Sequence, residues 1–131
     1  TLMWDETTEV DITSLCRAIC VKDDNIYIVN PLKLDEVNKA LDEAVAKTEP
    51  TVIITKWPCV LKKFSAQDKA EYDLAPKKCA VDQDKCKKCG MCAKTGCPAI
   101  YTGETVTIDA ASCTGCSVCS QVCPFDAIKE V

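Results

Sequence analysis

The chain has 131 residues, of which 47% are hydrophobic with cysteine included and 27% are charged, and its formal net charge is -4. This length allows one ordinary domain or two small ones with a modest core. No apolar run approaches the eighteen or so residues that a membrane-spanning helix needs, so we expect no membrane span. The acidic balance and the lack of a base-reading motif argue against a nucleic-acid partner.

The first ten residues, TLMWDETTEV, are acidic. They lack the basic region and the apolar region that together mark a secretory signal. We therefore expect a cytoplasmic protein. The chain starts at a threonine instead of an initiator methionine, which is compatible with a fragment of a longer protein.

Four elements are predicted in the first part of the chain. A helix begins after Asp11, a plausible N-cap, and carries apolar residues at helical spacing: Ile12, Leu15, Cys16 and Ile19. NIYIV and TVIIT read as strands, and LDEVNKALDEAVAK between them reads as a helix with one apolar stripe: Leu34, Val37, Leu41 and Val45. The order helix, strand, helix, strand predicts an α/β segment at the edge of a larger parallel sheet.

Glycine is absent from residues 1–56, which excludes phosphate-binding loops there. Dinucleotide fingerprints and P-loops need glycine where the backbone approaches a phosphate. All four glycines of the chain lie at or after position 90. This segment therefore carries no nucleotide-binding motif of those two kinds.

Four cysteines have no spacing that suggests a ligand. We interpret Cys16 and Cys20, one helical turn apart, as part of an apolar helix face, since free cysteine is an ordinary core residue. Cys59 lies in KWPCVLKKF and Cys79 enters a predicted strand, and a role for Cys59 stays open. Ser65 with Asp68 three residues later resembles a capping box, so we expect a short linking helix over 65–78.

The remaining eight cysteines form two crowded runs, CKKCGMCAKTGCP at 86–98 and CTGCSVCSQVCP at 113–124. Cysteines three residues apart are too close for good disulfide geometry among themselves. Structural zinc uses pairs of CxxC or histidines, and this chain has triplets and no histidine. A C-x2-C-x2-C-x3-C-P run is the pattern of 4Fe-4S clusters, so two clusters are predicted.

The two runs belong to a repeat of about 27 residues, because VDQDKC aligns with IDAASC and CPAI with CPFDAI. The repeat resembles the pseudo-twofold dicluster ferredoxins of bacteria, an α+β domain expected here over 79–131. In that pattern the fourth cysteine of each run ligates the other cluster. Cluster one then takes Cys86, Cys89, Cys92 and Cys123, and cluster two takes Cys113, Cys116, Cys119 and Cys97.

The spacer before Cys97 departs from the pattern, since four residues instead of three separate it from Cys92. Gly96 beside it can adopt the backbone angles that a bulge needs. AIYTGETVTID between the two runs reads as a hairpin around Gly103.

Lysines gather around the first run: Lys77, Lys78, Lys85, Lys87, Lys88 and Lys94. Eight thiolates and two oxidised clusters would take the net charge of the chain to about -8. The lysines are then a solvated face that offsets cluster charge, or a docking patch for an acidic electron carrier.

Taken together, VDITSLCRAICVKDDNIYIVNPLKLDEVNKAL, VIITKWPCVLKKF and the dicluster ending resemble the C-terminal end of the alpha subunit of indolepyruvate:ferredoxin oxidoreductase. The resemblance implies that residues 1–64 close a thiamine-diphosphate-binding α/β domain. It also implies oxidative decarboxylation of aryl 2-oxoacids, with coenzyme A as acyl acceptor, ferredoxin as electron acceptor, and a smaller beta subunit as partner.

The chain lacks the Gly-Asp turn by which that family holds thiamine diphosphate and magnesium. This piece is therefore expected to carry electrons and to depend on the remaining alpha subunit, or on a separate thiamine-domain polypeptide, for the decarboxylation. A free-standing ferredoxin-type carrier, or an adaptor subunit of another redox complex, is the alternative.

Overall fold

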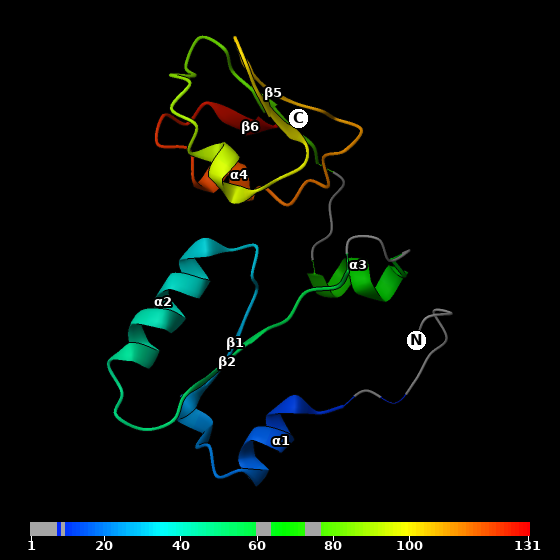
Figure 1. Cartoon of the computed structure of the whole chain (residues 1–131). Helices are drawn as coiled ribbons and strands as arrows, with labels where there is room; N and C mark the ends of the chain where they lie inside the picture. Colours follow the sequence, from blue (N-terminus) through cyan, green and yellow to red (C-terminus); the bar gives the residue numbers. More distant parts are fainter. Residues whose placement is uncertain (1–7, 9, 60–63, 73–76) are drawn as a thin grey trace. The chain divides into compact units, whose positions relative to one another are not determined.

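The structure is a computed structural model that describes residues 8, 10–59, 64–72 and 77–131 (Figure 1). Most of the acidic opening segment, residues 60–63 and part of the linker, 73–76, lie outside these residues. The chain divides into two compact units: Thr1–Asn30 with Asp35–Lys56, and Pro31–Leu34 with Trp57–Val131. No helix in the described part of the chain is long and apolar enough to cross a bilayer.

Helix α1, Ile12–Ala18, is the first element of the first unit within the described residues. Asp11 caps it, because its carboxylate accepts a hydrogen bond from the Ser14 backbone N–H at 3.0 Å. The predicted start of the helix is thus confirmed. Of its apolar stripe only Cys16 is buried, whereas Ile12, Leu15 and Ile19 are 50–68% exposed.

The prediction that Cys20 extends the apolar face of α1 is wrong. The helix ends at Ala18, and Cys20 is exposed with a φ of 68°. A residue in the left-handed region turns the chain out of the helix, so its side chain leaves the face on which Cys16 lies.

A parallel β-α-β arrangement follows, as predicted. The 3-10 turn η1, Asp23–Asn25, leads into β1, Ile26–Val29; α2 spans Leu34–Val45, and β2 spans Val52–Thr55. The two strands pair in parallel from Ile26↔Val52 to Val29↔Thr55. Helix α2 is the crossover that a parallel pair requires. Its buried position is Ala40, while Leu41 and Val45 at the end of the predicted stripe are exposed.

The second unit carries the linking helix α3, Ala66–Tyr72, and the cysteine-rich segment. The predicted cap of α3 is present: the Ser65 hydroxyl accepts from the Asp68 N–H at 3.1 Å, and the Asp68 carboxylate accepts from the Ser65 N–H at 2.9 Å. The remaining elements are β3 Cys79–Val81, η2 Cys92–Thr95, β4 Ile100–Thr102, β5 Val106–Ile108, α4 Val118–Gln121 and β6 Ile128–Glu130.

Two small antiparallel sheets organise the cysteine-rich segment (Figure 1). Strands β4 and β5 form the predicted hairpin around Gly103, in register Ile100↔Ile108. Strand β3 pairs with β6, which joins the start of the first repeat to the end of the second. This small α+β arrangement is consistent with the expected ferredoxin-like domain.

The backbone reproduces the sequence repeat. The Asp82 N–H donates to the carbonyl of Ala127 at 2.7 Å, and Asp109, 27 residues later, donates to the carbonyl of Ala99 at 2.9 Å. Both alanines are 1% exposed. The two halves of the segment are therefore equivalent in hydrogen bonding as well as in sequence.

Candidate iron-sulfur centres

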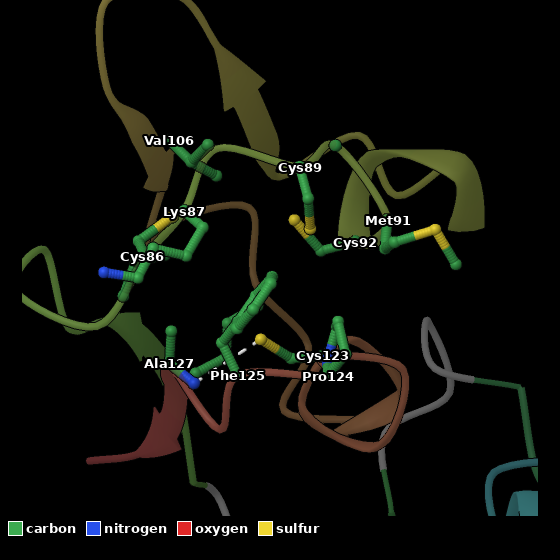
Figure 2. Close-up of a pocket in the computed structure, with 13 residues that line it drawn as sticks. Cys86, Lys87, Cys89, Met91, Cys92, Val106, Cys123, Pro124, Phe125 and Ala127 are labelled. Atoms are coloured by element: carbon green, nitrogen blue, oxygen red, sulfur yellow. Dashed lines mark hydrogen bonds between the residues drawn. The ribbon is translucent and has the colours of Figure 1, made fainter.

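Four cysteines from both repeats line one pocket, and Cys123 faces the other three across it (Figure 2). They are the four residues that the crossed pattern assigns to cluster one: Cys86, Cys89, Cys92 and Cys123. The rest of the lining is mainly apolar and includes Val106, Phe125 and Ile128. Sequence reasoning therefore named a set of residues that the fold brings to one cavity.

The structure gives less evidence that the four cysteines assigned to cluster two meet at one place. Cys113, Cys116 and Cys119 lie close enough to interact electrostatically through their thiols, and Cys113 and Cys119 are buried. Cys97 packs against the same hydrophobic core as these residues. The η2 turn that precedes it contacts α4, which carries Cys119. The assignment of Cys97 to cluster two remains a prediction.

The lengthened spacer closes as a 3-10 turn. η2 ends on Gly96, which has a φ of 71° and donates its N–H to the carbonyl of Ala93 at 3.1 Å. The extra residue is thus absorbed by a left-handed glycine, as the sequence indicated.

The surroundings of the sulfurs suit thiolate ligands. In Figure 2 the backbone N–H of Ala127 donates to the Cys123 sulfur at 3.4 Å. Burial raises the pKa of Cys92, and the N–H of Ala93, which donates to the Cys92 sulfur, offsets part of that rise. Such donors stabilise the charge that collects on cluster ligands. Within the described residues, no group of three Cys, Asp or Glu side chains is close enough to hold a single metal ion. A 4Fe-4S core needs no such group, because each of its four cysteines binds a different iron.

Burial raises the pKa of several thiols. It raises the pKa of Cys92 above the ordinary 9.0 and that of Cys119 to about 12, with the Cys79 thiol adding to the latter. These side chains are therefore protonated thiols at neutral pH when no cluster is bound. Thiolates are the form that binds iron, so binding must release their protons.

We accordingly expect cluster binding to the apo chain to strengthen as pH rises from 7 towards 9. Each proton released contributes about a tenfold gain in affinity per pH unit. The measurement is anaerobic reconstitution in weak buffer with a pH indicator, which counts the protons released per cluster. Binding that is independent of pH over this range would contradict the protonated starting state.

Each cysteine loop has two positions at which φ is positive, and glycine occupies a different one of these two positions in each half. Lys88 and Gly90 have φ values of 54° and 74°, and the equivalent Gly115 and Ser117 have 75° and 55°. A Cβ at Gly115 would overlap the backbone carbonyl oxygen of Lys77, whereas nothing lies within 4 Å of one at Gly90. Position 115 in the second loop therefore needs a glycine, because the backbone of Lys77 passes directly beside it.

Three of the clustered lysines have local partners. Lys77 forms an ion pair with Glu130 at 3.0 Å, and the ammonium groups of Lys78 and Lys88 donate to the carbonyls of Cys113 and Glu104. These contacts favour the interpretation of the lysines as a structural and charge-balancing group. A docking role stays a prediction for the others, among which Lys87 lines the cysteine pocket.

Phe125 distinguishes the two halves. CPFDAI contains two residues more than CPAI, and one of them, Phe125, lines the pocket of cluster one. Replacing it with alanine should admit water and dioxygen to that pocket, with several-fold faster loss of one cluster in air. The measurement is the decay of the visible absorbance of the reconstituted chain, with the exposed Tyr101→Ala as control. Equal decay in the wild type and in Phe125→Ala would show that the ring does not shield this pocket.

Comparison with known proteins agrees with these observations. A family described as "4Fe-4S binding domain" matches residues 106–129. Indolepyruvate oxidoreductase subunit IorA of Methanothermobacter thermautotrophicus is 35% identical over 97% of the chain. The resemblance to this subunit is confirmed. IorA of Archaeoglobus fulgidus is 34% identical over 79% of the chain, and IorA of Pyrococcus abyssi is 30% identical over 82%.

The chain spans about a fifth of the length of the IorA proteins that it matches, 19% in the Methanothermobacter thermautotrophicus protein. No solved structure is significantly similar to it. The IorA similarity extends over both units, whereas the 4Fe-4S family covers only the second repeat of the cysteine-rich segment. The chain thus contains a 4Fe-4S binding domain together with a preceding segment that IorA shares.

Proposed function

We propose that this chain transfers electrons through two 4Fe-4S clusters within an indolepyruvate-type 2-oxoacid:ferredoxin oxidoreductase. The observation that carries the proposal is the convergence of Cys86, Cys89, Cys92 and Cys123 on one pocket inside a segment similar to IorA. A second cluster is assigned to Cys113, Cys116, Cys119 and Cys97. When bound, each cluster accepts and donates one electron.

The residues of the chain hold the sulfurs, supply hydrogen bonds to them and keep water away. Backbone N–H groups at Cys92 and Cys123 stabilise thiolate charge, and Phe125 with the apolar lining lowers solvent access. Because the fourth ligand of each loop comes from the other half, the two centres would lie in one folded unit. Electrons can then pass between them without leaving the domain.

The rest of the enzyme is part of the same proposal. We infer that residues 1–64 form the edge of a thiamine-enzyme sheet, that 65–78 link the parts, and that 79–131 form the dicluster domain. The parallel β1–β2 pair and the exposed apolar residues of α1 support this inference. Thiamine diphosphate and magnesium would bind in the remaining alpha subunit, with a beta subunit and ferredoxin as partners. We place the complex in the cytoplasm, where thiols stay reduced.

The test combines cluster analysis with association. Anaerobic iron and acid-labile sulfide analysis should give about eight irons per chain, with an electron paramagnetic resonance (EPR) spectrum of two interacting reduced clusters. Affinity purification from native extract should recover thiamine-domain and beta-subunit polypeptides. Eight irons in a chain that stays monomeric would instead support the free-standing carrier, and zinc without sulfide would refute both functions.

A further inference from the structure

The two cysteine loops differ in charge. Residues 85–96 contain four lysines and no acidic residue, whereas the equivalent residues 112–122 contain no charged residue. All four lysines are exposed: Lys85, Lys87, Lys88 and Lys94. The positive charge therefore belongs to the loop of cluster one and is not a property of the repeat.

Balancing of cluster charge does not account for all of these lysines. Two 4Fe-4S clusters with four thiolates each carry the same charge, so a balancing role applies equally to both loops. The lysines at the second loop are held by local contacts: Lys77 pairs with Glu130, and Lys78 donates to the carbonyl of Cys113. At the first loop Lys88 is held in a similar way by the carbonyl of Glu104. The other three lysines need a separate explanation.

These three lysines are available to a partner. Within the described part of the chain, the ammonium groups of Lys85, Lys87 and Lys94 take part in no ion pair or side-chain hydrogen bond. An ammonium group without a local partner keeps its full field at the surface. Contact with a carboxylate of another protein would therefore break no bond within this part of the chain.

Exposed apolar side chains lie in the same region. Met91 is 41% exposed and Phe125 is 42% exposed, and both line the pocket of cluster one together with Lys87 (Figure 2). An apolar centre with a polar rim is the usual composition of a protein–protein interface. The basic face is defined here as Lys85, Lys87, Met91, Lys94 and Phe125.

We propose that the basic face is the docking site of an acidic one-electron carrier, and that electrons leave the chain there, next to cluster one. The inference rests on the proposed function, in which the chain passes electrons through two clusters. The chain as a whole is acidic, with a formal net charge of -4, so its average field repels an acidic partner. The lysine-rich loop attracts that partner locally and turns it towards cluster one. Each transfer oxidises the chain by one electron and reduces the carrier by one electron, without a proton or a further reactant.

The test uses the reconstituted full chain and two protein probes: a plant-type 2Fe-2S ferredoxin, which is acidic, and cytochrome c, which is basic. Carbodiimide joins lysines to carboxylates that touch them, and mass spectrometry of the cross-linked ferredoxin complex should identify Lys85, Lys87 and Lys94. Stopped-flow mixing with the reduced chain gives the rate of ferredoxin reduction. This rate should fall about tenfold or more between ionic strengths of about 10 mM and about 1 M.

A charge-reversal pair locates the attraction. Lys85→Glu combined with Lys94→Glu should slow ferredoxin reduction at low ionic strength about tenfold or more. Neither residue lines the pocket, so we expect eight irons per chain and no slowing of cytochrome c reduction. The matched control is Lys39→Glu combined with Lys129→Glu, which makes the same change in charge at exposed positions outside this loop. The control should have a much smaller effect on the ferredoxin rate.

Four outcomes would overturn the inference. Cross-links confined to other lysines would place the docking site elsewhere. A ferredoxin rate that does not depend on ionic strength, or an equal fall in the control pair, would exclude local attraction by this loop. Equal slowing with cytochrome c would show that the substitutions damage cluster one itself. A wild-type chain with eight irons that neither cross-links to ferredoxin nor reduces it would exclude docking, whereas a wild-type chain without two clusters would refute the proposed function.

Discussion

Gly115→Ala should abolish the second cluster and destabilise the cysteine-rich unit by about 3 kcal/mol or more. The added methyl group would overlap the Lys77 carbonyl oxygen, which is backbone and cannot rotate away. The φ of 75° adds about 1 kcal/mol of left-handed strain. The measurements are iron content after reconstitution and the thermal unfolding midpoint of the loaded chain.

Gly90→Ala is the matched control for this substitution. Its φ of 74° is almost the same, but nothing lies within 4 Å of the added Cβ. Ser117, at the equivalent place in the second half, already carries a side chain at positive φ. We expect a cost of about 1 kcal/mol and full iron content. Equal effects of the two substitutions would mean that backbone strain, and not the approach of Lys77, governs both loops.

Cys123→Ala should remove cluster one and leave cluster two in place, reducing the iron content from about eight to about four. Cys123 belongs to the second run but lies in one pocket with Cys86, Cys89 and Cys92 of the first run, so its loss should expose the first loop. The measurement is anaerobic alkylation with mass spectrometry. Cys86, Cys89 and Cys92 should become reactive, while Cys113, Cys116 and Cys119 should stay protected.

Cys97→Ala is the mirror experiment and should give the opposite alkylation pattern. If Cys123→Ala instead exposed the cysteines of its own run, ligation would not be crossed between the halves. Loss of all eight irons in either variant would show that the clusters assemble only together. The control is Cys59→Ala, since Cys59 is exposed and outside both runs, and it should keep about eight irons.

Local signals in the sequence predicted most of the elements correctly. Asp11 and Ser65 cap α1 and α3 by contacts within one helical turn, and the Gly103 turn joins β4 and β5. The meeting of four cysteines in the first pocket was also predictable, because three of them lie in one loop and the fourth follows a repeat rule. Each of these features depends on a few neighbouring residues or on a recurring motif.

Features that depend on distant partners were not predictable from spacing. Helical periodicity indicated one apolar face on α1 but not whether anything covers it, and Leu15 is exposed. The packing of Cys79 into one buried core with Cys119 depends on the pairing of β3 with β6. The clash at Gly115 depends on the path of Lys77, a residue outside the repeat. Spacing along a chain carries no information on such contacts.

The pairing of β3 with β6 has a consequence for biosynthesis. The β4–β5 hairpin joins neighbouring segments and can form as soon as both have left the ribosome. Strand β3 can pair only after residues 128–130 have been synthesised, and the pocket of cluster one is complete only after Cys123 has been synthesised. Until then the first cysteine loop is open to metals and oxidants in the cell. Iron delivery to this pocket is therefore expected to follow translation of the whole segment.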